Sequence, residues 1–159
     1  MASDPSDKPT HFKEIASNRK AGFQYEILET LEVGIVLKGT EIKSLRQYGA
    51  SLQESYITID DGQMTLINAT ITPYTFASFY NHEEKRKRRL LAHKKEIEHF
   101  RASIQEKGLT AVPLSIYLKN GKAKVKIALA RGKKLYDKRE TIKEREDTRQ
   151  IQRMMKNTP

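Results

Sequence analysis

The chain has 159 residues, of which 37% are hydrophobic and 31% are charged. This length suits one domain with a single core, and the low apolar share predicts that part of the chain lies outside that core. The 30 Lys and Arg residues exceed the 20 Asp and Glu residues, and the net charge of +10 indicates a polyanionic partner. Nucleic acid is the first candidate and an anionic membrane surface is the second.

The sequence contains no predicted membrane-spanning segment and no predicted metal site. No apolar run reaches the length of a transmembrane helix, and Met1–Thr10 lacks the apolar stretch of a signal peptide, so we expect a cytoplasmic protein. Cysteine is absent, which excludes disulfides, thiolate nucleophiles and cysteine-based zinc sites. His82, His93 and His99 do not show the spacing that would place two imidazoles on one metal, so we expect neither a metal nor any other cofactor.

The first predicted elements occupy the N-terminal third of the chain. Met1–Thr10 is polar and is predicted to be disordered. Alternating apolar side chains from Tyr25 to Val33 predict a strand, which Gly34 interrupts with a bend or bulge. Thr40 can cap a short helix, and Gly49 can end it in the left-handed conformation.

Two hairpins and one long helix are predicted further along the chain. Asp61-Gly62 joins two strands in a tight turn, and Asn120-Gly121 is the strongest hairpin signal in the sequence. Between them, apolar positions at helical spacing predict an amphipathic helix from Arg86 to Lys107, and the core is expected to end near Ala130. The prediction is a mainly β fold: an antiparallel six-stranded barrel with two or three helices and a disordered basic C-terminal tail.

Three segments concentrate positive charge. Lys85–Arg89 contains five adjacent cations, and at the start of a helix they would be unfavourable unless RNA phosphates neutralised them; the alternative is a solvated charged loop. Lys119–Lys134 contains no acid, although Lys124 and Lys126 could equally serve to block edge pairing of a strand. In the tail, Arg131–Pro159, a helix would align cations into a ridge on a docking partner, while a solvated helix of mixed charge is the plainer alternative.

The residues give no support to enzymatic chemistry. No phosphate-binding loop, nucleophile elbow or metalloprotease motif occurs, and Asp60-Asp61 suits a turn better than a catalytic pair. Aromatic side chains could stack on unpaired bases, but most are expected in the core. Tyr136 is the exception, because it stands among charges beyond the core.

Several ordered segments together resemble the SsrA-binding protein family, also called small protein B. They include GTEIKSLR, RLLAHKKEI and GKKLYDKRETIKER, and the resemblance extends from about Phe12 to Lys156. It implies an oligonucleotide-binding-type barrel that holds the tRNA-like domain of transfer-messenger RNA (tmRNA). It further implies a tail that occupies the vacant decoding centre and mRNA channel of a stalled ribosome during trans-translation, which rescues the ribosome and tags the peptide, with no bond chemistry by the protein.

The resemblance also assigns site residues. The positions matched to RNA binding, together with two arginines of the basic run, are Asn18, Arg19, Lys20, Tyr25, Glu32, Lys43, Arg46, Arg86, Arg88, Leu91 and His93. The positions expected to act in the decoding centre are Gly132, Lys133, Lys134, Tyr136, Asp137, Lys138, Arg139, Lys143, Arg145, Arg149 and Arg153. Family members often have His where Tyr136 stands, Pro where Glu84 stands and Leu where Ala92 stands.

The expected organisation is a disordered stretch over residues 1–10, an RNA-binding domain over 11–130 and a tail over 131–159 that folds on the ribosome. The expected partners are tmRNA and the rRNA of the small-subunit decoding centre, with no membrane and no small-molecule substrate, and the protein is expected to be a monomer. Two rivals remain open. A structural ribosomal protein would share the basic charge and barrel, and an RNA-processing nuclease would need a catalytic pair around His93 or His99 that the sequence does not supply.

Overall fold

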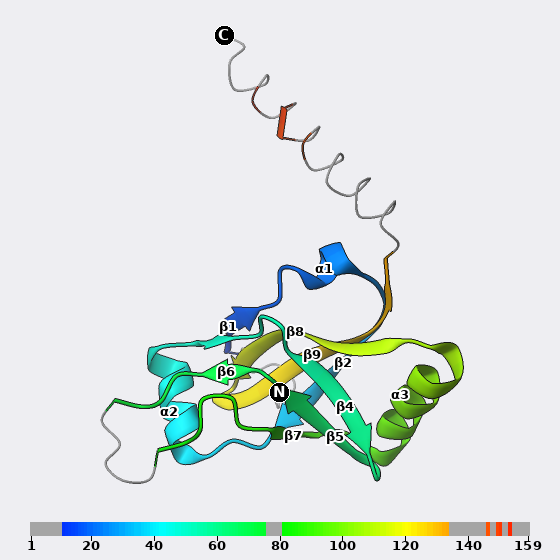
Figure 1. Ribbon diagram of the computed structural model, residues 1–159. Helices are drawn as coiled ribbons and strands as arrows, with labels where there is room; N and C mark the ends of the chain where they lie inside the picture. Colours follow the sequence, from blue (N-terminus) through cyan, green and yellow to red (C-terminus); the bar gives the residue numbers. More distant parts are fainter. Residues whose placement is uncertain (1–10, 76–80, 134–145, 147–148, 151–152, 154–159) are drawn as a thin grey trace, which may run out of the picture.

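The computed structural model describes residues 11–75 and 81–133 and the single positions 146, 149, 150 and 153 (Figure 1). Its helices are α1 (Ala21–Gln24), α2 (Gly39–Gln47) and α3 (Lys94–Lys107). Its strands are β1 (Phe12–Ser17), β2 (Tyr25–Ile35), β3 (Ala50–Ser51), β4 (Tyr56–Asp60), β5 (Gln63–Ile67), β6 (Thr70–Ile71), β7 (Arg88–Leu91), β8 (Thr110–Lys119) and β9 (Lys122–Gly132).

Seven strands form one sheet in the order β1-β8-β9-β2-β7-β5-β4, and every neighbouring pair is antiparallel. β3 and β6 form a separate two-stranded sheet beside α2 (Figure 1). The prediction of a mainly β, antiparallel fold with up to three helices is confirmed. The prediction of six strands closed into a barrel is not, because within the described residues hydrogen bonding ends at β1 on one side and at β4 on the other.

Both predicted hairpins are present. Asp61 and Gly62 join β4 to β5 with φ of 49° and 73°, and Asn120 and Gly121 join β8 to β9 with φ of 52° and 79°. Asn, Asp and Gly tolerate positive φ, which the tight turn needs in order to match the twist of its strands. The turn residues therefore fix the register of both hairpins.

β2 lies at the centre of the sheet and bends at an unexpected place. Its register against β9 shifts between Ile27 and Glu29, so the bulge is at Leu28 and the predicted bend at Gly34 is wrong. Gly34 instead pairs with Leu91 of β7 and also lies opposite Lys124 of β9. The strand thus passes from one partner to the next at a residue without a side chain.

The helix boundaries correct two predictions. α2 begins after Lys38 rather than Thr40, and the Lys38 amide donates to Glu41 Oε1 at 2.8 Å; Gly49 ends the region with φ of 83° as predicted. The predicted helix from Arg86 to Lys107 is present only from Lys94, because Arg88–Leu91 is a strand. Arg88 and Leu90 are buried while Arg89 and Leu91 are exposed, which is the alternation of a strand. The helical spacing of the apolar residues that follow led to the prediction of a helix here.

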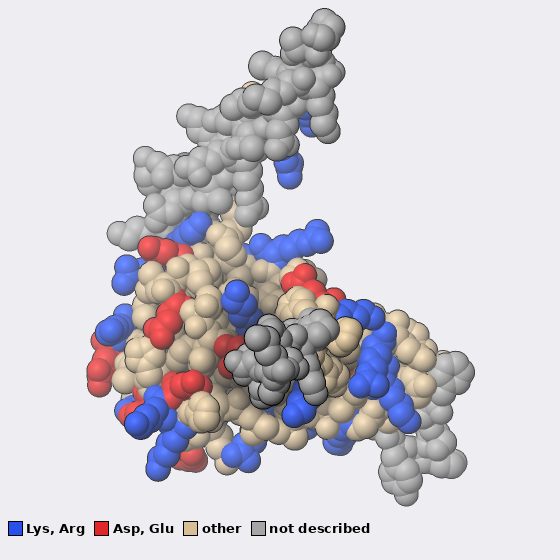
Figure 2. Space-filling view, turned by 180° about the vertical axis from the view of Figure 1, so that it is seen from behind, with Lys and Arg blue, Asp and Glu red and all other residues tan. Residues whose placement is uncertain are grey.

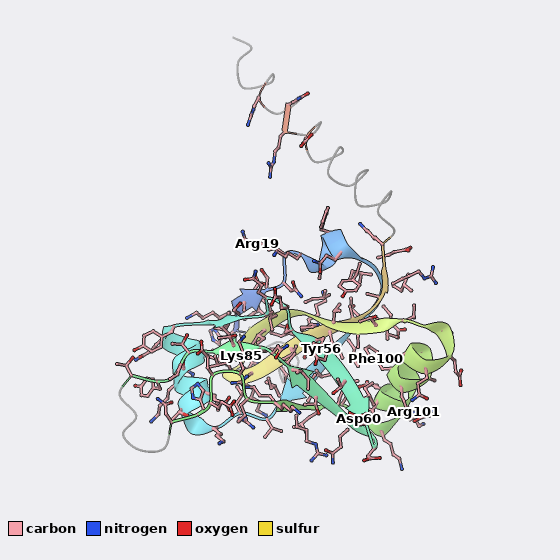
Figure 3. All side chains as sticks on the ribbon, viewed as in Figure 1. Arg19, Tyr56, Asp60, Lys85, Phe100 and Arg101 are labelled. Atoms are coloured by element: carbon pink, nitrogen blue, oxygen red, sulfur yellow. The ribbon has the colours of Figure 1, made fainter. Side chains whose placement is uncertain are left out.

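Besides a small cluster of Val112, Ala128 and Ala130, the core is one large cluster of mostly aliphatic side chains from the strands, α2 and α3. Phe100 of α3 is buried in it, and Figure 3 shows this residue on the side of the helix that faces the sheet. The last buried residue described is Ala130, as expected, although β9 continues to Gly132. No helix among the described residues is long and apolar enough to cross a membrane.

Candidate nucleic-acid interface

A groove forms where β2, β7 and the start of α3 meet. Pairing of Gly34 with Leu91 brings the end of β2 beside the end of β7, and His93 follows as the residue before α3. The groove has a volume of about 390 Å³ and is lined by Glu32, Gly34, Leu91, Ala92, His93, Glu96 and Lys124. Three predicted RNA-binding residues that are far apart in the sequence, Glu32, Leu91 and His93, therefore share one site.

Leu91 forms the apolar wall of this groove. Leu91 is 51% exposed and lines the groove, so an apolar surface is available to a partner there. A Cβ built on Gly34 would lie 3.3 Å from Cβ of Leu91. Because Gly34 has no side chain, Leu91 can pack close to the backbone of β2 at this position.

Glu32 is the acidic centre of the site. It accepts a hydrogen bond from the Tyr117 hydroxyl, and Lys119 Nζ lies 3.5 Å from its other oxygen. The Tyr117 hydrogen bond is the main cause that lowers the pKa of Glu32, while burial and this same bond raise the pKa of Tyr117. The carboxylate therefore stays ionised at neutral pH and can accept hydrogen bonds from base amino groups.

Backbone hydrogen bonds fix the position of His93 immediately before α3. Its N–H donates to Glu96 Oε2 at 3.3 Å, and its carbonyl accepts from the backbone N–H groups of Glu96 and Ile97 at 2.9 and 3.0 Å. The side chain is left to line the groove.

A second hollow holds three more predicted residues. It has a volume of about 270 Å³ and is lined by residues 17–20 and 50–53, including Asn18, Arg19 and Lys20. Asn18 Nδ2 donates to the Pro113 carbonyl at 3.0 Å, so this side chain ties the loop to β8. Arg19 and Lys20 are exposed, and Figure 3 shows Arg19 beside α1, well separated in that view from Arg101 on α3.

Tyr25, Lys43 and Arg46 line neither the groove nor the second hollow. Tyr25 is at the opposite end of β2, where it pairs with Gly132 and packs beside Val112. Lys43 lies 5.9 Å from the centre of the Tyr74 ring, and Arg46 is exposed in the last turn of α2. The structure does not gather these side chains with Glu32.

The basic run Lys85–Arg89 divides into inward and outward side chains. Arg88 is fully buried; its Nε donates to Glu41 Oε2 at 2.5 Å and its Nη1 donates to the Ala69 carbonyl at 2.8 Å. Arg86 Nη2 donates to the other Glu41 oxygen at 2.6 Å. The prediction that Arg88 contacts RNA is therefore wrong for the folded chain, and Arg86 is largely committed to the same carboxylate.

This buried cluster also sets the charge of Glu41. Burial alone would raise its pKa, but hydrogen bonds from Arg86, the Lys38 amide and Arg88 outweigh it and hold the pKa below the usual value. Only Lys85, Lys87 and Arg89 of the run are exposed and available to a partner.

Comparison with known families gives a match over most of the chain. The family model described as "SmpB protein" covers residues 15–157. The chain belongs to the SmpB family. Curated relatives called "SsrA-binding protein" agree: one from Protochlamydia amoebophila is 53% identical and one from Trichormus variabilis is 52% identical. The first alignment covers 90% of this chain and 94% of the relative, and the second covers 96% and 99%.

A solved structure extends the similarity to three dimensions. It is described as "tmRNA-SmpB: a journey to the center of the bacterial ribosome" and is 46% identical to this chain, with a TM-score of 0.64. The match covers 79% of this chain and 92% of that one. The fold described above is therefore an SmpB fold.

Little of the SmpB tail lies within the described residues. Gly132 ends β9, and Lys133 donates through its backbone N–H to Gln24 and through Nζ to Gly22, at 3.0 and 3.1 Å. Arg149 and Arg153 are exposed and have helical backbone. Outside the described residues are Lys134, Tyr136, Asp137, Lys138, Arg139, Lys143 and Arg145.

The structure adds site residues that the sequence did not single out. Tyr117 was expected in the core and Lys124 was left open as an edge-blocking lysine, yet one holds Glu32 and the other lines the groove. Lys124 is on β9, which pairs with β2, and Tyr117 is on β8, which pairs with β9. The register of the β8–β9 hairpin could therefore have indicated that both residues lie near β2. No metal-binding cluster of His, Cys, Asp or Glu is present in the described part of the chain.

Proposed function

We propose that this SmpB family member binds the tRNA-like domain of tmRNA through the groove formed by Glu32, Leu91 and His93. In this proposal the protein performs no catalysis and acts in the cytoplasm, where translating ribosomes are. The observation that carries it is the convergence of these side chains from β2, β7 and the start of α3 on one groove.

The chemistry of the groove suits structured RNA. An exposed leucine, an ionised carboxylate and an imidazole offer contacts to bases and sugars, whereas phosphates would be held by cations. Lys124 lines the groove, Arg19 and Lys20 line the second hollow, and the exposed Arg89 belongs to the same strand as Leu91. Figure 2 shows Lys and Arg spread over the face opposite to that of Figure 1, with Asp and Glu concentrated toward its left side.

The second half of the proposal is delivery to a stalled ribosome. The relatives are called SsrA-binding proteins, and the solved structure places its tmRNA-SmpB in the context of the bacterial ribosome. We assign residues 11–130 to RNA binding and residues 131–159 to the vacant decoding centre and mRNA channel.

For the fold, we propose an oligonucleotide-binding-type barrel. β4 is the last strand of the sheet, yet it packs against β8, the neighbour of the first strand. Such proximity of the two edges is what a curled, partly open barrel requires.

Sequencing the RNA that co-purifies with the chain tests the function. tmRNA should dominate the RNA bound to the wild type and be strongly depleted with Leu91→Asp, because this change replaces the apolar wall of the groove with a third negative charge beside Glu32 and Glu96. Tyr56→Asp, at an exposed tyrosine of β4 outside the groove, is the control and should retain tmRNA.

Co-sedimentation separates this function from that of a structural ribosomal protein. A rescue factor should be substoichiometric and enriched on stalled ribosomes. A one-to-one ratio to all ribosomes, or RNA without enrichment of tmRNA, would contradict the proposal.

A further inference from the structure

A third hollow lies on the other side of Glu32, and the proposed function does not use it. It has a volume of about 440 Å³ and spans the outer surface of β1, β8, β9 and β2. Its lining residues are Phe12, Glu14, Thr30, Leu31, Glu32, Ser115, Tyr117 and Lys126. Glu32 is thus a shared wall between this hollow and the groove of Leu91 and His93.

Phe12 supplies an aromatic surface at the edge of the hollow. It is the first residue of β1 and is 60% exposed, the highest value among the large hydrophobic side chains of the described chain. Its ring centre lies 4.7 Å from that of Tyr117, with 36° between the ring planes. The ring is therefore held by one neighbour and leaves most of its surface to solvent, as a stacking platform for a base does.

Tyr117 orients the polar part of the same hollow. Its side chain is almost fully buried, and its hydroxyl donates to Glu32 Oε2. A buried donor with a fixed ring restricts the rotation of an otherwise exposed carboxylate. Each oxygen of that carboxylate retains acceptor capacity, because an ionised carboxylate has about four lone-pair sites.

Cations next to the carboxylate make the hollow compatible with RNA. Lys126 lies directly opposite Glu32 in the β2–β9 pairing and lines the hollow, and Lys119 Nζ lies 3.5 Å from Glu32 Oε1. These ammonium groups offset the charges of Glu32 and Glu14 and can hold the phosphate that follows a bound base.

We propose that this hollow is a subsite for one unpaired guanine of the bound RNA, which stacks on Phe12 and donates to Glu32. Guanine fits best because N1–H and the N2 amino group form two adjacent donors on one edge, matching the two oxygens of a carboxylate. Adenine and cytosine present a single amino donor there. Tyr117 is the positioning residue, and the subsite rests on the proposed function, since the RNA is tmRNA.

The test uses the full chain and a tmRNA transcript. Phe12→Ala should weaken binding about tenfold, the lower part of the range for loss of one base–aromatic stack. Phe12→Tyr should bind nearly as tightly as the wild type because it keeps the ring. Tyr56→Ala, which removes another exposed aromatic side chain outside the hollow, is the matched control.

A second readout reports the base itself. Kethoxal modifies N1 and N2 of unpaired guanine, so the wild type should protect one guanine that both Phe12→Ala and Glu32→Gln leave reactive. Tyr117→Phe should weaken binding, and its effect should be less than additive with that of Glu32→Gln, because Tyr117 acts only by positioning the carboxylate that Glu32→Gln removes.

The outcomes separate the two proposals. If the wild type binds tmRNA but Phe12→Ala binds equally well, or no guanine shows protection that depends on Phe12, the subsite is overturned while the function stands. Phe12-dependent protection of an adenine or cytosine from dimethyl sulfate, with no guanine protected from kethoxal, would overturn the assignment of the base. If the wild type does not select tmRNA, both proposals are overturned.

Discussion

Burial gives Arg88 a structural role in place of the predicted RNA contact. The guanidinium is fully inside the protein and bonded to Glu41 and to backbone carbonyls of neighbouring segments. Removing one member of such a pair leaves the other as an uncompensated buried charge. The role of Arg88 is therefore to join α2 to β7.

The first prediction concerns this ion pair. Arg88→Ala should lower the free energy of unfolding by about 3–5 kcal/mol, because buried Glu41 would keep only the partly exposed Arg86 and the Lys38 amide as partners, and the buried space of the guanidinium would be left empty. Lys87→Ala, at the exposed neighbouring position, should change it by less than about 0.5 kcal/mol. Urea unfolding measures both, and equal small losses for the two variants would show that the buried pair contributes little.

The second prediction concerns pH. The pKa of Glu41 is lower in the folded state than its reference value of 4.5, so its contribution to stability is complete above that value. The contribution should be lost as the pH falls below 4.5 towards the lowered folded-state pKa. Unfolding midpoints measured across this acidic range should therefore fall more steeply for the wild type than for Glu41→Gln, and parallel curves would contradict the linkage.

At the scale of elements, the junction of β2 and β7 determines the groove. Gly34→Ala should push Leu91 outward by a few tenths of an ångström, because the new Cβ would lie 3.3 Å from the leucine Cβ. We expect a several-fold loss of tmRNA affinity. Gly22→Ala is the control, since a Cβ there meets no atom within 4 Å. Filter-binding titrations compare the two, and an unchanged affinity for Gly34→Ala would mean that the spacing of this junction does not matter.

The same junction shows where prediction from sequence succeeds and where it does not. Both hairpins were predicted, because positive φ at Asp61 and Asn120 is a local requirement that the residues themselves express. The strand at Arg88–Leu91 was missed, since a helical spacing of apolar residues from Leu90 onward is also compatible with a short strand followed by a helix. The burial of Arg88 depends on Glu41, which is distant in the chain, so no local pattern could predict it.

The candidate site was predictable to a similar degree. Glu32, Leu91 and His93 came from a family resemblance, and the structure brings them together. The role of Tyr117 requires knowing that its hydroxyl reaches across β9 to Glu32, which depends on strand order and register. Composition and spacing could not distinguish it from an ordinary core tyrosine.

At the scale of the whole molecule, the proposed division of labour can be tested by truncation. A chain that ends after Lys133 keeps β9 and should retain tmRNA affinity within about tenfold, roughly 1.4 kcal/mol. It should fail to support peptide tagging on stalled ribosomes. Replacing Asp137, Lys138 and Arg139 together with Ala in the full chain should reproduce this pattern, and a large loss of RNA affinity in either variant would assign the tail to the RNA site.

The placement of β9 has a mechanical consequence for such a tail. β9 is hydrogen-bonded along its length to β8 on one side and to β2 on the other, and Gly132 at its end still pairs with Tyr25 (Figure 1). A pull on the tail that is directed along β9 enters at Gly132 and loads two ladders of hydrogen bonds in shear. Bonds loaded in shear share the force, whereas bonds at a peeling end break one after another. Residues 11–133 can therefore bear tension while a partner holds the C-terminal tail. In a pulling experiment, detaching β9 from the C-terminal end should require a higher force than detaching β4, which is paired on one side only.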